Sequence, residues 1–109
     1  MHRMTPEIDV QKLAELRDEG TQHTLLDVRE QQELDICRLS ECVHIPMQQV
    51  PYRIDDLPRD RPLVVLCHHG TRSRQVTEFL RHSGFENATN LAGGIDAWSL
   101  QIDDKVSRY

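Results

Sequence analysis

The sequence predicts an α/β domain in three layers, with a mostly parallel sheet of about five strands and helices on both faces. Segments typical of strands alternate along the chain with segments typical of helices. The run LVVL at 63–66 is continuously apolar, as expected for a strand buried on both faces of a parallel sheet. The 109 residues suffice for one hydrophobic core and carry no linker or repeat. We therefore expect a single domain over residues 1–109.

In the first half of the chain, extended and helical segments take turns. Leu13 and Leu16 have helical spacing, with Asp9 as a suitable N-cap and Gly20 as the stop. The apolar run in HTLLDVRE predicts a strand, and CVHIP predicts a short strand that Pro46 ends. The expected elements are an extended piece at 5–9, a helix at 10–20, a strand at 23–30, a helix at 30–36, a strand at 42–46 and a proline-broken helix at 47–60.

The second half contains the clearest strand and the clearest helix. RPLVVLC at 61–67 is the strand, and SRQVTEFLRHSG at 73–84 is the helix. Val76, Phe79 and Leu80 give this helix an apolar stripe, and Gly84 is its C-terminal stop. After it we expect a strand and glycine turn at 88–94, a helix at 95–101 and a tail over about 100–109.

Composition and charge exclude several classes of protein. The net charge is −5 and no Lys/Arg-rich block occurs, so we expect no nucleic-acid partner. No apolar run approaches the roughly 20 residues of a membrane span, and the N-terminal sequence lacks a secretory signal, so we expect no membrane association and a cytoplasmic location. Three cysteines, an odd number, argue against a disulfide framework.

Cys67 ends the apolar strand, and the loop HHGTR joins it to the next helix. The first turn of a helix has unpartnered N–H groups and the positive end of the helix dipole, so a thiolate is stabilised there. Gly70 can take a positive φ that turns loop amides inward as an anion-binding cup, and Arg72 adds a charge suited to an oxyanion. We therefore expect an activated cysteine nucleophile in a shallow cup open to solvent.

CHHGTRS at 67–73 resembles the active-site loop of rhodanese-like sulfurtransferases, which has a cysteine, four residues, an arginine and then a serine or threonine. LLDVREQQEL, VHIP and NLAGGIDAW resemble further signatures of that family, in the same order along nearly the whole chain. The tail QIDDKVSRY is similar to tails of rhodanese domains fused to ubiquitin-like-protein-activating enzymes. One segment departs from the family, because Arg38 and Glu41 stand where a histidine and then a glycine are usual.

The resemblance implies a rhodanese-like sandwich and a sulfurtransferase that needs no metal or organic cofactor. Cys67 would take the outer sulfur from thiosulfate, a persulfide or a polysulfide, and pass it to cyanide, a thiol or a protein cysteine. Arg72, with help from Arg74, would bind the donor anion. The residues that would form the cradle for the Cys67 persulfide are His68, His69, Gly70, Thr71, Arg72 and Ser73.

Two other functions remain open. Cysteine phosphatases place five residues between cysteine and arginine, whereas four separate Cys67 from Arg72. The shorter loop favours a cup for a sulfur atom over a phosphatase or an arsenate reductase. The second alternative is a rhodanese-like module that binds a partner protein, without catalysis or as a dedicated sulfur relay. The retained cysteine disfavours a module without chemistry, but it is compatible with a relay.

The neighbouring histidines suggest a metal site, which we do not expect. His68 and His69 are adjacent, adjacent residues rarely chelate one ion well, and no C-x-x-C pair accompanies them. No pattern places His44 nearby as a further ligand. A protonated histidine beside Cys67 would instead favour the thiolate.

Four other residues are expected to support the site or to take no part in it. Asp27 and Arg29 could contact substrate, but the resemblance favours a structural or supporting role for both, as a buried or half-buried ion pair that organises the neighbouring strand ends. Cys37 and Cys42 could resolve a persulfide or form a redox pair, but we favour inert, partly buried thiols.

Overall fold

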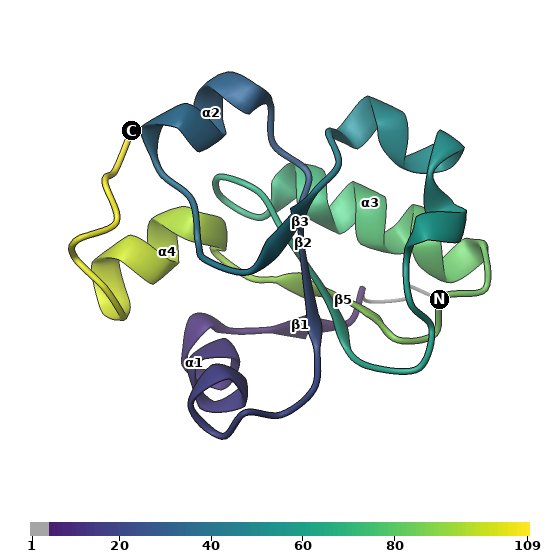
Figure 1. The fold of residues 1–109 in the computed structure, drawn as a ribbon, viewed down its shortest axis with the longest axis horizontal. Coiled ribbons are helices and arrows are strands. Elements are labelled where there is room, and N and C mark those ends of the chain that lie inside the picture. The colour runs from purple at the N-terminus through teal and green to yellow at the C-terminus, as the bar shows by residue number, and fades with distance from the viewer. Residues whose placement is uncertain (1–4) are drawn as a thin grey trace.

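The computed structural model describes residues 5–109. Within these residues, five strands form one sheet in the order β1-β5-β4-β2-β3, and every neighbouring pair is parallel (Figure 1). The expected parallel sheet is therefore confirmed. The strands are β1 (Glu7–Ile8), β2 (Thr24–Asp27), β3 (Cys42–His44), β4 (Leu63–Leu66) and β5 (Ala88–Leu91).

Helical segments connect the strands and cover both faces of the sheet (Figure 1). The proline-broken stretch forms two short 3₁₀ helices, as its interrupted pattern suggested. The α-helices are α1 (Val10–Asp18), α2 (Gln31–Ile36), α3 (Thr71–His82) and α4 (Gly94–Gln101), and the 3₁₀ helices are η1 (Met47–Tyr52) and η2 (Ile54–Asp56).

Alternate side chains of the central strands feed two separate hydrophobic clusters. Leu26 and Val65 join the cluster beneath α3, η1 and η2, whereas Leu25 and Val64 join the cluster beneath α1 and α4. All four are at most 1% exposed, so β2 and β4 are buried on both faces. The sheet therefore forms the middle of three layers, as expected.

The helix α3 begins at Thr71, two residues before the predicted start, because Gly70 turns the chain with a φ of +108°. The expected apolar stripe of this helix is partly wrong. Val76 and Leu80 are buried, but Phe79 is 39% exposed. Thr77 is buried in its place, because its hydroxyl donates to the Ser73 carbonyl at 2.8 Å and is thereby satisfied.

The segment that departs from the family pattern adopts the backbone that glycine favours. Among residues 5–109, Glu41 is the one non-glycine residue with a positive φ, at 58°. The turn before β3 therefore contains a left-handed residue, and Glu41 carries the strain of that conformation.

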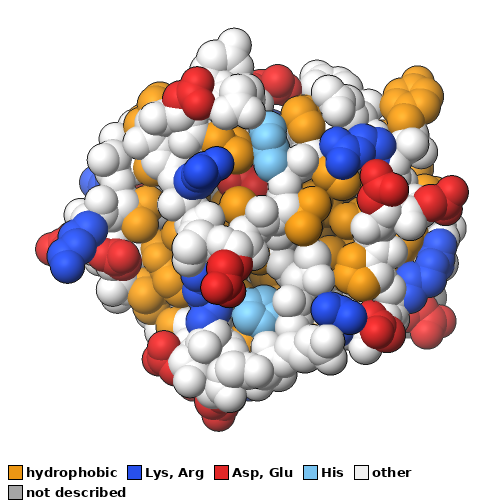
Figure 2. All heavy atoms as spheres, in the orientation of Figure 1, with side chains coloured by type: hydrophobic (Ala, Val, Ile, Leu, Met, Phe, Trp, Pro, Cys, Tyr) orange, Lys and Arg blue, Asp and Glu red, His pale blue; other side chains and the backbone are white. Residues whose placement is uncertain are grey.

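The surface in Figure 2 carries acidic and basic side chains interspersed, with no extended basic area on this face. None of the helices formed by residues 5–109 has the length and apolar character that a membrane crossing requires.

Candidate active site

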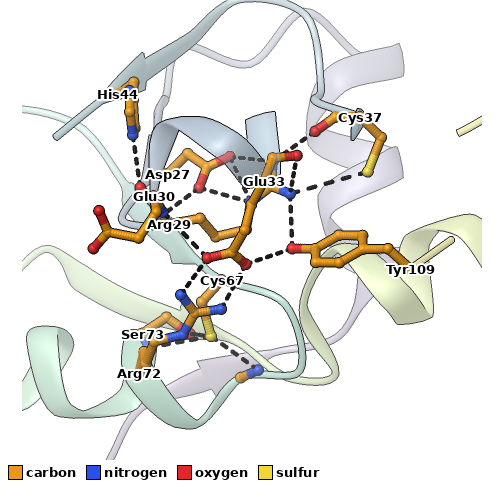
Figure 3. Close-up of polar contacts among 11 residues, drawn as sticks. Asp27, Arg29, Glu30, Glu33, Cys37, His44, Cys67, Arg72, Ser73 and Tyr109 are labelled. Carbon is orange, nitrogen blue, oxygen red and sulfur yellow. Dashed lines mark hydrogen bonds and ion pairs between the residues drawn. The ribbon is translucent and has the colours of Figure 1, made fainter. Parts of the chain in front are cut away.

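The carboxyl ends of the two central strands bring the predicted site residues together. Asp27 and Leu66 are register partners in β2 and β4, so Arg29 and Cys67 follow at the same edge of the sheet. This is the edge at which ligand sites gather in open parallel sheets. Figure 3 shows Asp27 and Arg29 at the end of β2 close to Cys67, which follows β4, and to Arg72 on α3.

Inward-pointing amides surround the Cys67 sulfur. The Gly70 N–H donates to Cys67 Sγ at 3.1 Å and the Ser73 N–H donates at 3.4 Å. The Ser73 hydroxyl oxygen lies 3.3 Å from the same sulfur. These donors come from the loop and the first turn of α3, and they suit a sulfur that carries negative charge.

The expectation of an open cup is wrong, because Cys67 is only 1% exposed. Its side chain belongs to the hydrophobic cluster beneath α3. In Figure 3 the Arg72 guanidinium lies by the sulfur, with Glu33 and Tyr109 beyond it. A donor therefore reaches the sulfur only after side chains around the loop have moved.

The expected anion-binding arginine is already paired. Arg72 Nη1 and Nη2 donate to Glu33 Oε1 and Oε2 at 2.7 and 2.8 Å, which is a bidentate ion pair between α3 and α2. The Arg72 guanidinium lowers the pKa of the Glu33 carboxyl to about 2, and this carboxylate in turn raises the pKa of Arg72. Arg72 is consequently not free to bind a donor anion in this conformation.

Tyr109 brings the tail to the same cluster. Its hydroxyl donates to Glu33 Oε2 at 2.6 Å and accepts from Arg29 Nη1 at 3.0 Å. Its ring stacks on the His68 ring, with centroids 3.8 Å apart and planes 7° apart. Burial is the main cause that raises the pKa of Tyr109 to about 12. The tail thus forms part of the wall of the site.

Asp27 and Arg29 form a buried ion pair, with both side chains 0% exposed. Arg29 Nη2 donates to Asp27 Oδ2 at 2.7 Å, and Arg29 Nε donates to both carboxylate oxygens. The same guanidinium donates to the Cys37 carbonyl at 2.9 Å. His44 Nε2 lies 2.7 Å from the Arg29 carbonyl oxygen, on the side of β3. The pair therefore ties β2, the end of α2 and β3 together.

A second polar chain leads from the sulfur toward β1. The Ser73 hydroxyl donates to Asn90 Oδ1 at 2.5 Å, and the Asn90 amide donates to the Gly70 carbonyl at 3.2 Å and to Glu7 Oε2 at 2.8 Å. Serine has one hydroxyl hydrogen, so Ser73 donates either to Asn90 or to Cys67 at any moment. Asn90 thereby influences whether the hydroxyl supports a thiolate.

Arg74, the second expected anion binder, points away from the sulfur toward β1. Its Nη2 donates to Glu7 Oε2 at 3.1 Å, on the outer side of the Asn90 chain. The side chains of His69 in the loop and of Thr71, the first residue of α3, are exposed and do not enclose the sulfur. The predicted cradle thus divides into residues that face the sulfur and residues that only shape the loop.

His68, His69 and Asp96 have potential ligand atoms that all lie within 4.8 Å of one another. Asp96 is already paired with Arg108, whose Nε donates to Oδ1 at 2.9 Å. Burial and the neighbouring His69 lower the pKa of His68, which disfavours the charged form of this imidazole. In this structure Asp96 is thus engaged by a guanidinium and the His68 ring by the Tyr109 ring.

The other two cysteines are partly buried and free. Cys37 Sγ lies 4.0 Å from Arg29 Nη1, and burial raises the pKa of Cys42. A raised pKa disfavours the thiolate, so Cys42 is a poor nucleophile at neutral pH.

Comparison with known proteins finds rhodanese-like domains and sulfurtransferases. The model of the rhodanese-like domain family matches residues 9–101. A sulfurtransferase of Allochromatium vinosum is 32% identical over 96 residues, covering 88% of this chain and 90% of that protein. A putative sulfurtransferase of Bacillus subtilis is 34% identical over 99 residues, covering 91% and 95%. The crystal structure of a rhodanese-related protein from Thermoplasma volcanium superposes with a TM-score of 0.78 at 32% identity, covering 89% and 93%.

Proposed function

The chain belongs to the rhodanese-like domain family, and we propose that it moves a sulfane sulfur from thiosulfate or a persulfide to a thiophilic acceptor through a persulfide on Cys67. Family membership and the sulfurtransferase relatives support sulfur transfer in general terms. The observation that carries the finer proposal is the pair of amides, from Gly70 and Ser73, that donate to the Cys67 sulfur.

In the first half-reaction the Cys67 thiolate attacks the outer sulfur of the donor. A new sulfur–sulfur bond forms on Cys67 while the donor's own sulfur–sulfur bond breaks. The leaving group takes the electron pair, as sulfite from thiosulfate or as a thiolate from a persulfide. No oxidant or reductant is needed, because the electrons of the broken bond leave with the leaving group.

In the second half-reaction an acceptor thiolate attacks the outer sulfur of the Cys67 persulfide. The persulfide bond breaks, its electron pair returns to Cys67 as thiolate, and the acceptor leaves as a persulfide. Cyanide would leave as thiocyanate. The inward-facing amides of Gly70 and Ser73 would favour the thiolate that appears at the start and at the end of the cycle.

The experiment is intact-mass measurement of the protein after incubation with thiosulfate or a small persulfide. We expect a gain of one sulfur atom that cyanide removes. Cys67→Ser should abolish the gain, whereas Cys37→Ser and Cys42→Ser, the matched controls, should keep it. A gain that survives Cys67→Ser would transfer the carrier role to another cysteine and overturn the proposal.

A further inference from the structure

Three arginines follow the central strands near Cys67, and the guanidinium of each is paired with a carboxylate. Arg29 pairs with Asp27 at 2.7 Å, Arg72 with Glu33 at 2.7 Å and Arg74 with Glu7 at 3.1 Å. The first pair is fully buried and holds the strand ends. The third points away from the sulfur. Arg72 is thus the arginine whose pairing decides whether a donor anion can bind beside Cys67.

Glu33 occupies both terminal nitrogens of Arg72, and further groups hold it in place. Tyr109 donates to its Oε2, and its Oε1 accepts from the Glu30 N–H at 3.2 Å in the capping box of α2. The Glu33 side chain is 19% exposed and the Arg72 side chain 35% exposed, so solvent screens the pair only in part. The carboxylate has the position that an oxyanion on Arg72 would otherwise take.

This arrangement distinguishes donors by their charge. Thiosulfate brings two negative charges toward a thiolate and must compete with Glu33 for the Arg72 nitrogens. A sulfane sulfur on an uncharged thiol brings at most one charge and has no sulfonate group that needs a guanidinium. Like charges at distances of a few ångströms cost the most where solvent is partly excluded.

We infer that Glu33 is a specificity-determining positioning residue, which by pairing with Arg72 makes the site disfavour dianionic donors and accept a sulfane sulfur carried on a thiol. The inference rests on the proposed function, since it names the donor class for the same Cys67 persulfide.

The test uses three donors: thiosulfate, a dianion; methanethiosulfonate, a monoanion that keeps sulfonyl oxygens; and the persulfide of N-acetylcysteamine, which carries at most one charge and no sulfonyl group. The rate of sulfur addition to Cys67 is followed by quenched intact-mass measurement for each donor. In Glu33→Gln, addition from thiosulfate should rise by about tenfold, addition from methanethiosulfonate by less, and addition from the thiol persulfide by less than about twofold. The gain with thiosulfate should shrink at high salt.

Two control variants separate charge at Arg72 from a general effect on α2. Asp35→Asn removes a carboxylate from the same helix, where Asp35 accepts from Gln31 rather than from an arginine, and it should leave all three rates unchanged. Glu33→Asp keeps the negative charge, so it should keep most of the preference of the unsubstituted protein for the thiol persulfide over thiosulfate. Thermal unfolding of each variant establishes that it is folded.

Equal changes for the three donors in Glu33→Gln, or no change, would overturn the inference while the Cys67 adduct itself stands. Absence of an adduct with every donor in the unsubstituted protein would instead overturn the proposed function. If Glu33→Gln does not fold, Tyr109→Phe provides the test, because it removes one hydrogen bond to Glu33. In Tyr109→Phe the rate of sulfur addition should rise most with thiosulfate and least with the thiol persulfide, as in Glu33→Gln but by smaller factors. Equal changes for all three donors would again overturn the inference.

Discussion

At Gly94 the backbone of α4 touches the active-site loop. A Cβ on Gly94 would lie 2.5 Å from the carbonyl oxygens of both Cys67 and His68. The next two amides, of Ile95 and Asp96, donate to these carbonyls at 2.9 and 3.1 Å. The close approach therefore fixes the backbone that carries the nucleophile, and it needs a residue without a side chain.

Replacing this glycine should damage both stability and the site. We expect Gly94→Ala to lower the free energy of unfolding by about 3 kcal/mol, from a left-handed backbone and from overpacking, and to slow sulfur addition to Cys67. Gly20→Ala is the control, because Gly20 also has a positive φ but a Cβ there meets nothing within 4 Å. It should lower stability by only about 1 kcal/mol, with normal sulfur addition. Urea unfolding measures the first quantity, and similar losses in both variants would contradict the clash.

Glu41 is the opposite case, because a residue with a side chain stands at a position whose backbone conformation favours glycine. Its φ of 58° is strained for a residue with a Cβ, and the side chain is exposed. We expect Glu41→Gly to raise the free energy of unfolding by up to about 1 kcal/mol, because relief of strain exceeds the added entropy of the unfolded chain. Glu41→Ala, which keeps the Cβ, should give no such gain. A destabilised Glu41→Gly would mean that the turn carries little strain.

At the scale of elements, the tail acts as a wall of the site. Val106 packs on the cluster beneath α1 and α4, Arg108 pairs with Asp96, and Tyr109 stacks on His68. In Figure 1 this segment runs from the end of α4 toward α2. It thus reaches both the loop that carries Cys67 and the helix that carries Glu33.

Removing the Tyr109 ring should make Cys67 easier to reach. In Tyr109→Ala, we expect alkylation of Cys67 by iodoacetamide to accelerate by about threefold or more, because the ring no longer restrains His68 and Glu33. Peptide mass mapping identifies the alkylated cysteine, and Cys42 serves as the internal reference. Tyr52→Ala, which truncates a tyrosine that is 88% exposed, should leave the rate unchanged. An unchanged rate in Tyr109→Ala would show that other groups close the sulfur.

The sequence predicts the elements well because their signals are local. The apolar run of β4, the N-cap Asp9 and the stops at Gly20 and Gly84 each act within a few residues of their own position. The start of α3 differs from the prediction because it depends on the backbone of Gly70 rather than on hydrophobic periodicity. Periodicity also misplaced Phe79, because burial on that face depends on which elements pack against it.

The contacts between side chains of the site could not be predicted in the same way, because the residues that make them are far apart in the sequence. Glu33 meets Arg72 across 39 residues of sequence, and Tyr109 meets Glu33 across 76. No local pattern indicates either contact. A polar residue in the last strand, Asn90 in ATNL, was the one signal that could have drawn attention to the chain from Ser73 to Glu7. These long-range contacts help to bury the Cys67 sulfur. Because no local pattern reveals them, the sequence predicted a cup open to solvent.

At the scale of the whole molecule, one edge of the sheet gathers charges from β1, β2, α2 and α3. Carboxylates from β1, β2 and α2 face guanidinium groups that follow β2 or lie on α3, and the tail adds a phenol. The hydrophobic clusters lie on the two faces of the sheet, whereas these ion pairs lie at its carboxyl end. The strand ends, α2, α3 and the tail are thus held to one another by charge as well as by packing.

Stability should accordingly depend on the ionisation of Glu33. Its pKa of about 2 lies below the ordinary value of 4.5, because the ionised carboxylate pairs with Arg72 and accepts from Tyr109. A lowered pKa means that the fold binds this proton less tightly than the unfolded chain, so the contribution is complete above about pH 4.5 and is lost as the pH falls toward 2. Partial exposure of the pair reduces the effect, and we expect the loss to be about 2 kcal/mol.

Urea unfolding of the unsubstituted protein and Glu33→Gln at several pH values between 7 and 3 measures this contribution, because the amide cannot titrate. The unsubstituted protein should be the more stable of the two at neutral pH, and the difference should narrow steadily below about pH 4.5, where unfolded chains begin to take up the Glu33 proton. Parallel curves would mean that the ion pair joining α2 to α3 adds nothing to the fold. If the two curves also coincide, Glu33 can be replaced without structural cost, and any change in donor preference in Glu33→Gln is due to charge alone.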